Sequence, residues 1–224
     1  MINYDYILQD FPFVKAAWAK QIDDDMDLAR IADSALQNKI ADLSVQPEYV
    51  SKLWAWLENK KVKIIARFYA ENIKKNTENN ISLLTENINA CFKQGADGVQ
   101  VFIKKNDVSV FADQLCLIRD DLFFNKTLSI GLNLSDLYTA DLKSLFISLK
   151  KIKADSLLLV LTKDEGDKSD FVGRVYGILS SWDDEFYGAL HFVIGDNSVR
   201  VEQVIRLVQK VRPELLPKIR FFMS

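Results

Sequence analysis

The sequence predicts an α/β fold of the (β/α)8, or TIM-barrel, class, and two observations carry this prediction. From about residue 39 onward, short apolar runs that are too compact to be helices alternate with longer segments of helical period. The short runs begin roughly 22 to 36 residues apart, which is the size of one βαβ unit. A βαβα order throughout is typical of a parallel sheet that is covered by helices.

Composition and charge exclude several other classes. The chain has 224 residues, of which 49% are hydrophobic, enough to fill the core of one large α/β domain. Lys+Arg number 29 and Asp+Glu number 31 without a block of like charges, so we expect neither nucleic acid nor a membrane surface as a partner. The single His and the 2 Cys cannot form a His/Cys metal cage, and no nucleotide-binding or serine-hydrolase motif is present. No metal or cofactor is therefore expected.

The first residues of the sequence do not resemble a secretory signal. Asp5 stands where a secretory signal would carry Lys or Arg, and no apolar run reaches the roughly 18 to 20 residues of a membrane helix. Cys91 and Cys116 each fall in a helical pattern among apolar residues, where a thiol behaves as a small hydrophobe. We therefore expect a cytoplasmic protein without disulfides.

Seven strands are predicted along this pattern. Each is a short run rich in aliphatic and aromatic residues, as expected for strands that are buried on both faces of a parallel sheet. They cover residues 39–45, 62–69, 98–104, 127–134, 155–162, 187–195 and 218–223.

Between the strands, apolar residues recur at the three- and four-residue spacing of amphipathic helices. One helix is predicted over residues 47–60. Gly95 is the expected left-handed residue after another. Five of the helical stretches follow a residue type that caps helices, namely Asn80, Asn106, Thr139, Ser169 and Ser198.

An eight-stranded barrel requires one more strand, and residues 28–36 are the candidate. The same residues fit a helix equally well, because their apolar positions recur at helical spacing. Residues 1–27 are predicted to form a helical or irregular N-terminal lead-in that plugs or flanks the barrel. No linker rich in Gly, Pro or Ser interrupts the chain, so residues 1–224 are expected to form one domain.

The alternation of side chains along each strand predicts which residues face the inside of the barrel. Apolar positions must face the helices, so the alternate positions, which are often polar, point inward. In the strand at 62–69, for example, Ile64 and Ala66 face out and Arg67 faces in. Inward polar side chains near the carboxyl ends of strands are candidates for a functional site. They are Arg67, Lys104, Asn133 and Thr162, with Gln100 and His191 one layer deeper.

Three short motifs lie at the approaches to predicted strands. Asp-Leu-Ser-Val-Gln-Pro-Glu-Tyr-Val at 42–50 precedes a helix and the strand Val-Lys-Ile-Ile-Ala at 62–66. Gly-Ala-Asp stands at 95–97 and Lys-Ala-Asp at 153–155. In order and spacing, these motifs resemble the second and third strands and the approaches to the fourth and sixth strands of deoxyribose-phosphate aldolases. The resemblance covers roughly residues 28 to 224 and implies the same barrel fold.

The resemblance also implies where that family's catalytic groups would fall. Those aldolases form a Schiff base with a Lys on the sixth strand, and this position is Leu158, which has no nucleophilic nitrogen. The acidic residue of their fourth strand falls on Gln100, and a second Lys, on the seventh strand, falls on His191. Imine chemistry is therefore not expected, whereas His191 is available as an acid or base because its reference pKa lies near neutrality.

Part of a phosphate-binding motif follows the seventh predicted strand. In such barrels the loop after the seventh strand and the helix that follows it hold a phosphate through backbone N–H groups. Gly195 and Ser198 match this arrangement, but Asp196 would repel a phosphate. An ordinary capped turn remains the alternative.

Two hypotheses of function follow. In the first, the chain is a divergent aldolase-like barrel that binds a small anionic or phosphorylated carbonyl compound; any enzyme activity would be lyase-like or isomerase-like without a Schiff base. Its substrate- or anion-binding residues would be Arg67, Lys104, Gln100, Gly195 and Ser198, and its catalytic residues His191 and Asn133. In the second, the barrel is a non-catalytic binding or assembly module, a pseudoenzyme.

The mouth of the barrel distinguishes these hypotheses. Convergence of the predicted polar residues on one open space favours the first, whereas a mouth filled by the N-terminal segment or by Phe102 and Tyr69 counts against it. Trp54 and Trp56 fall on different sides of the helix predicted over 47–60. One of them is therefore available for a contact in a homodimer.

Overall fold

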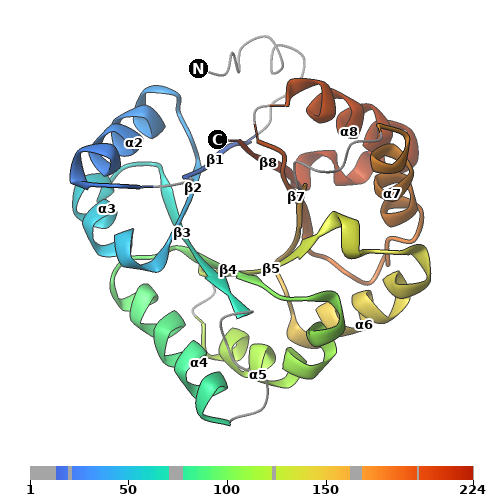
Figure 1. The fold of residues 1–224 in the computed structure, drawn as a ribbon, viewed down its shortest axis with the longest axis horizontal. Coiled ribbons are helices and arrows are strands. Elements are labelled where there is room, and N and C mark those ends of the chain that lie inside the picture. The colour runs from blue at the N-terminus through green and yellow to red at the C-terminus, as the bar shows by residue number, and fades with distance from the viewer. Residues whose placement is uncertain are drawn as a thin grey trace.

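Eight parallel strands close into a barrel in the order in which they occur along the chain (Figure 1). The computed structural model describes residues 14–19, 22–70, 78–122, 125–161, 168–195 and 197–223. Each strand pairs with the next, and β8 pairs with β1 to complete the ring. The strands are β1 (Val14–Trp18), β2 (Asp42–Val45), β3 (Lys63–Tyr69), β4 (Gly98–Phe102), β5 (Thr127–Asn133), β6 (Ser156–Val160), β7 (Ala189–Val193) and β8 (Ile219–Met223).

Helices surround the barrel on the outside (Figure 1). Short 3-10 turns lead into α3, α5 and α6, and another, Pro213–Lys218, leads into β8. Among the helices of the described ranges, none combines the length and the apolar character that a membrane span needs. The helices are α2 (Asp25–Gln37), α3 (Val50–Leu57), α4 (Glu78–Lys93), α5 (Val108–Asp121), α6 (Leu142–Ile152), α7 (Lys168–Ser180) and α8 (Ser198–Val211).

The predicted (β/α)8 class is confirmed, and each of the seven predicted strands occurs. The observed strands are shorter than the predicted runs. Apolar residues mark where the chain is buried, and the buried segment extends beyond the residues that pair with a neighbouring strand. Ile103, for example, follows the end of β4 and is still buried in the core.

The first strand differs from the prediction. Residues 28–36 lie in α2, which Asp24 caps by accepting a hydrogen bond from the N–H of Asp27 at 2.8 Å. The strand is instead β1, inside the segment predicted as a helical or irregular lead-in, and that prediction is wrong for Val14–Trp18. Val-Lys-Ala-Ala-Trp shows little alternation, and its extended form depends on pairing with β2 and β8, both distant in sequence. Residues 1–13 of the predicted lead-in lie outside the described residues.

Two apolar cores agree with the predicted inward and outward faces. Outward residues such as Ile64, Ala66 and Phe68 join the large core between the barrel and its helices. A separate cluster combines residues of five different strands, which only the interior of a closed barrel can bring together. Its members are Ala16, Phe102, Leu158, Val193 and Phe222.

The Ala-Asp motifs are structural in this fold. The carboxylate of Asp97, just before β4, accepts a hydrogen bond from the N–H of Ile64 in β3 at 3.0 Å. Asp155, just before β6, does the same for the N–H of Leu128 in β5 at 2.8 Å. Each carboxylate therefore ties the start of its own strand to that of the preceding strand, and an Asp at this place is expected whatever the protein does.

Several predicted helix starts are shifted by a few residues. Asn197, and not Ser198, caps α8, because its side chain accepts a hydrogen bond from the N–H of Arg200 at 3.1 Å. Asn80 lies inside α4, which begins two residues earlier. Asn106 lies in the 3-10 turn that precedes α5. Gly95 adopts the predicted positive φ, at 106°.

Candidate functional site

Aromatic rings occupy the carboxyl end of the barrel interior. Phe102 of β4 stacks on Tyr69 at the end of β3, with ring centroids 5.0 Å apart. Trp18, the last residue of β1, meets Phe102 edge-on at 5.5 Å and Phe222 of β8 at 6.3 Å. These rings stand where the mouth of a catalytic barrel receives its substrate.

Arg67 lies against this aromatic group. Its guanidinium carbon is 4.1 Å from the centre of the Trp18 ring, and Nη2 donates a hydrogen bond to the carbonyl oxygen of Ala19. Arg67 is 3% exposed, and its Nε has no hydrogen-bond partner. Within the described residues, no carboxylate forms an ion pair with it. In the part of the chain that the structure describes, Arg67 is therefore a buried cation without an anionic partner.

The pKa of Arg67 follows from this position. Burial lowers the pKa of the guanidinium, and longer-range interactions with Tyr69 and Glu48 oppose that fall. A guanidinium nevertheless keeps its proton at neutral pH, because its ordinary pKa lies far above neutrality. The positive charge stays in the interior.

Gln100 lies beside Arg67 on the neighbouring strand, since the two residues are partners in the β3–β4 register. It is buried, and its Oε1 accepts a hydrogen bond from Oγ of Ser44 in β2 at 2.6 Å. One of its polar atoms is thus already used within the barrel.

His191 lies deeper, at the middle of β7. Its ring centroid is 5.9 Å from that of Phe222, and its Nδ1 is buried without a hydrogen-bond partner. Burial, assisted by the nearby charge of Arg220, lowers the pKa of His191 to about 3. The imidazole is neutral at neutral pH and has no proton to donate as a general acid, so the predicted catalytic role finds no support in this environment.

Below His191 the barrel interior is polar. Asp42 of β2 forms an ion pair with Arg220 of β8, across the intervening strand β1. Burial raises the pKa of Asp42, although the charge of Arg220 restrains the rise. Ser156 donates a hydrogen bond to Ser129 at 2.7 Å, on the neighbouring strands β6 and β5. This is the amino end of a parallel barrel, where buried polar groups usually serve stability.

The predicted rim residues are exposed. Asn133, at the end of β5, donates a hydrogen bond to Asp136 at 3.4 Å, and Lys104, just beyond β4, is exposed. Gly195 follows β7 with φ of 65°, as a tight turn into α8 requires, whereas the side chain of Ser198 is not among those described. Thr162 lies outside the described residues.

The predicted polar residues occupy three levels of the barrel. Asn133 and Lys104 lie at the rim, Arg67 and Gln100 lie below the aromatic rings, and His191 lies at the middle of β7. The register explains the separation. His191 pairs with Leu158 in the middle of β6, whereas Asn133 pairs with Val160 at its end.

The position that the resemblance assigns to the imine-forming Lys is fully buried. Leu158 is 0% exposed and packs in the inner apolar cluster against Phe102, Phe222 and Val193. An ammonium group there would lose its hydration without gaining a partner from this cluster. The side chain at this position packs in the apolar interior of the barrel.

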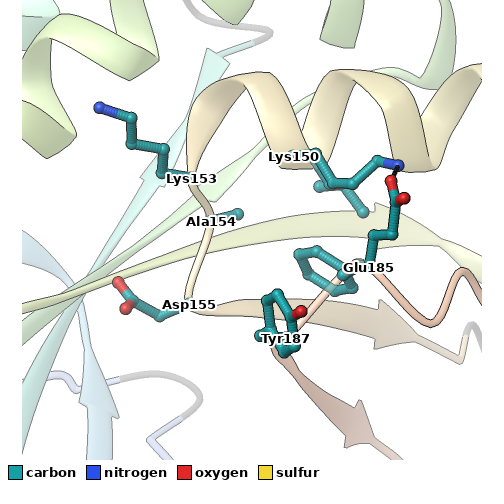
Figure 2. A pocket seen from close by; sticks show the side chains of 9 residues that line it. Lys150, Lys153, Ala154, Asp155, Glu185 and Tyr187 are labelled. Carbon is teal, nitrogen blue, oxygen red and sulfur yellow. Dashed lines mark hydrogen bonds and ion pairs between the residues drawn. The ribbon is translucent and has the colours of Figure 1, made fainter.

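A pocket of about 450 Å³ lies away from the mouth, between the end of α6 and the loop that leads into β7 (Figure 2). Its charged side chains already have partners. Lys150 pairs with Glu185 at 2.8 Å, Lys153 with Asp120 at 2.5 Å, and Asp155 with Arg119 at 3.0 Å. The pocket therefore offers no unpaired charge to a ligand.

Comparisons with known proteins agree on the fold. No protein-family model matches the sequence, and no curated protein matches it either. Solved structures do match. An apo structure from Toxoplasma gondii ME49, assigned to deoxyribose-phosphate aldolase, superposes with a TM-score of 0.72 at 16% identity over 98% of this chain and 91% of that one.

Two further structures show the same barrel. A deoxyribose phosphate aldolase from Aeropyrum pernix, described as a tetramer, gives a TM-score of 0.64 at 11% identity over 93% of this chain and 84% of that one. The copper homeostasis protein CutC from Streptococcus agalactiae gives 0.60 at 9% identity over 94% and 98%. The fold is that of deoxyribose-phosphate aldolases. At these identities the likeness concerns the fold, and a different biological role on the same barrel is equally compatible with it.

Sequence patterns missed two features of the interior. Trp18, which covers Arg67, fell in the segment predicted as a lead-in, and no local signal tied it to the mouth. The pairing of Asp42 with Arg220 joins residues 178 positions apart, and no local sequence pattern connects them. Within the described residues, no group of three or more His, Cys, Asp or Glu side chains is placed to hold a metal ion.

Proposed function

We propose that this chain is a non-catalytic, aldolase-like barrel that binds a small anion at Arg67. The observation that carries the proposal is a buried guanidinium whose neighbours include a carbonyl oxygen and an aromatic ring but, among the described residues, no paired carboxylate. A charge buried without a countercharge costs several kcal/mol in order of magnitude, and an anionic ligand supplies the missing charge.

The chemical class of the ligand follows from the donors and the fold. A guanidinium presents several N–H groups in one plane, which matches the oxygens of a phosphate or a carboxylate. Nη2 donates to the carbonyl oxygen of Ala19, whereas Nε is buried without a partner among the described residues and is available to a ligand. A small phosphorylated or carboxylated carbonyl compound fits both this donor set and the aldolase resemblance.

The non-catalytic part rests on three positions of the interior. Leu158 provides no amine for an imine, Gln100 carries no titratable proton, and His191 is neutral with a pKa of about 3. Each position that the resemblance links to catalysis therefore holds a group unable to do the corresponding chemistry.

Access to Arg67 requires a side chain to move. The Nε atom is sealed from solvent, and Trp18 lies directly over the guanidinium. Trp18 is half-buried and ends β1, so a rotation of its ring would expose the guanidinium toward the mouth. Binding should therefore alter the indole fluorescence.

Replacing Arg67 by Met tests the anion site. Inorganic phosphate and a short phosphorylated aldehyde should each raise the melting temperature of the wild-type protein above that in chloride of equal ionic strength. The Arg67→Met variant should lose this increase, and without ligand it should unfold at the same or a higher urea concentration, since it no longer buries an unpaired charge. Arg206→Met, on the exposed side of α8 where Arg206 pairs with Glu202, is the matched control.

Borohydride trapping tests the absence of imine chemistry in the same samples. With a panel of aldehydes, the wild-type protein should form no covalent adduct, while a deoxyribose-phosphate aldolase treated in parallel should form one. An adduct on an inward lysine such as Lys63 would refute the non-catalytic proposal. An Arg67→Met variant that keeps its phosphate response, or that loses stability without ligand, would show that Arg67 only holds Trp18 and Ala19 in place.

A further inference from the structure

The indole of Trp18 occupies the place over Arg67 that a ligand of this site has to take. Its ring centre lies 4.1 Å from the guanidinium carbon of Arg67. The same ring meets Phe102 and Phe222 edge-on, with centroids 5.5 Å and 6.3 Å away. Aromatic rings prefer such edge-on contacts with one another and face contacts with cations, so the surroundings of this place suit an aromatic ring.

Trp18 is the ring of this group that can leave. Phe222 is 1% exposed and Phe102 is 8% exposed, whereas Trp18 is half-buried. The ring of Phe102 is also held against β5, because it lies over Gly131, where an added Cβ would be 2.4 Å from the ring. Rotation of the indole toward solvent therefore leaves a ring-sized space between Phe102, Phe222 and the guanidinium.

The charge that this space offers is a single positive one. Arg220, a further cation of the described interior, already pairs with Asp42 at the amino end of the barrel. A carboxylate carries one negative charge, which Arg67 balances alone, whereas a phosphate monoester carries about 1.5 to 2 negative charges at neutral pH. The excess charge of the phosphate would lose its hydration without gaining a partner, so the site favours a carboxylate.

The walls of the space are mostly apolar. Leu158, Val193 and Phe222 belong to the inner apolar cluster, and Val160 packs against it. The amide oxygen of Gln100 already accepts a hydrogen bond within the barrel. Hydroxyl groups of a sugar would lose water here without gaining partners, whereas burial in such surroundings favours an aromatic ring. The body of the ligand is therefore apolar.

A short chain has to connect the ring of the ligand to its carboxylate. The space left by Trp18 lies over the face of the guanidinium. A carboxylate instead pairs with N–H groups in the guanidinium plane, and Nε is buried there without a partner among the described residues. A ring bonded directly to its carboxylate cannot occupy both positions, because the carboxyl group is then held at the edge of the ring.

Building on the anion site proposed above, we infer that its ligand is an arylalkyl carboxylate whose ring replaces the indole of Trp18. The class includes 3-arylpropionic acids and aryl 2-oxo acids, in which two carbon atoms separate the ring from the carboxylate. This ligand class depends on the anion site, because Arg67 binds the carboxylate. Without ligand, Trp18 itself closes the site.

A ligand series measured by calorimetry on the wild-type protein tests the class. 3-Phenylpropionate should bind about tenfold or more tightly than propionate, because it also buries a phenyl ring. Benzoate lacks the connecting chain, 3-phenylpropanol lacks the charge, and 2-phenylethyl phosphate carries more charge than Arg67 balances. Each of these three should bind more weakly than 3-phenylpropionate, and an equal or higher affinity of any of them, or of propionate, would overturn the assignment.

Trp18→Ala tests the exchange of rings. This variant should bind 3-phenylpropionate more tightly than the wild type does, since no indole has to be displaced. Trp56→Ala, which removes an exposed indole of α3 outside the barrel, should bind it like the wild type. Weaker binding by Trp18→Ala would show that the indole holds the ligand, and would overturn the exchange.

Fluorescence tests the exchange without a change in affinity. In the wild type and in Trp56→Ala, 3-phenylpropionate should shift the indole emission to longer wavelength as Trp18 moves into water. Trp18→Ala should lose this shift. A shift that persists in Trp18→Ala, or binding to the wild type without any shift, would contradict the movement of Trp18.

The outcomes separate the ligand class from the anion site itself. If propionate and inorganic phosphate bind through Arg67 and 3-phenylpropionate binds no better, the anion site stands and the ligand class is wrong. If Arg67→Met binds 3-phenylpropionate as tightly as the wild type does, both are wrong.

Discussion

Burial acts on the pKa of Arg67 and of His191 in the same direction, with different consequences for charge. It lowers both pKa values, but the pKa of the guanidinium starts so far above neutrality that the proton stays, whereas the imidazole becomes neutral with a pKa of about 3. The upper interior therefore keeps a positive charge while the lower interior loses one. This difference supports the proposal that the inside of the barrel binds an anion and does not transfer protons.

Acidification should reveal the buried imidazole. The unfolded chain takes up a proton on His191 near its reference pKa of about 6.5, well before the folded chain does, so stability falls as pH drops below that value. Between about pH 7 and about pH 5, the wild type should therefore lose more stability than the His191→Gln variant, which has no such group. Urea unfolding across this range measures the difference, and parallel pH profiles would contradict it.

At the level of single residues, sequence parity predicted the interior position of Arg67, Gln100 and His191. It did not predict what they contact. The carbonyl oxygen of Ala19 and the ring of Trp18 reach Arg67 from a strand that local periodicity did not identify, and Arg220 reaches His191 from the far end of the chain. Contacts between residues that are distant in sequence form only when the barrel closes. A single sequence therefore indicates which polar residues point inward but not which residues contact them.

At the level of elements, the sequence predicted the strands that are buried on both faces and the helices that bury one face. The strands from β2 to β8 follow apolar runs that result from burial on both faces, and α5 and α6 follow amphipathic stripes. β1 contains two Ala among its five residues and offers no such run. Its conformation depends on the two strands between which it lies, a tertiary effect that overrides local propensity.

The turn between α4 and β4 should be sensitive to a single methyl group. Gly95 has φ of 106°, and a Cβ added there would lie 2.1 Å from Cδ1 of Trp54 on α3. Gly95→Ala should therefore cost about 2 kcal/mol of unfolding free energy, from backbone strain and displacement of the indole. Urea denaturation with fluorescence detection measures both effects.

The matched control has the opposite expected sign. Gly173 lies within α7, and nothing lies within 4 Å of a Cβ placed there. Gly173→Ala should stabilise the protein by about 0.5 to 1 kcal/mol, because Ala is the better helix former. Equal effects of the two substitutions would refute the role assigned to the Gly95 turn.

At the scale of the whole molecule, the barrel closes where β1 pairs with β2 on one side and with β8 on the other. The Asp42–Arg220 ion pair connects these two strands beneath β1. Asp42 is 2% exposed at its side chain and Arg220 33%, so the carboxylate depends on its partner more than the guanidinium does. The ion pair therefore acts as a clasp on the seam of the barrel.

Removing one half of the clasp should destabilise the barrel in a pH-dependent way. Arg220→Met leaves a buried carboxylate without a cation and should cost about 2 kcal/mol at neutral pH, below the loss for a fully buried pair because Arg220 is partly exposed. The loss should shrink on acidification, because the folded state, in which the pKa of Asp42 is raised, takes up a proton first. Adding Asp42→Asn should restore much of the stability at neutral pH, and a double variant as unstable as the single one would contradict the clasp.

The position of β1 also has a consequence for synthesis. Residues of β1 pair with β8, so the first of these strands to leave the ribosome must wait for the last before the ring closes. Until then, a nascent chain exposes one free edge at β1 and another at its newest strand, both lined by unpaired backbone groups. Stalling translation just before β8 should therefore yield an open sheet, and its seam would be the place where misfolding or chaperone binding begins.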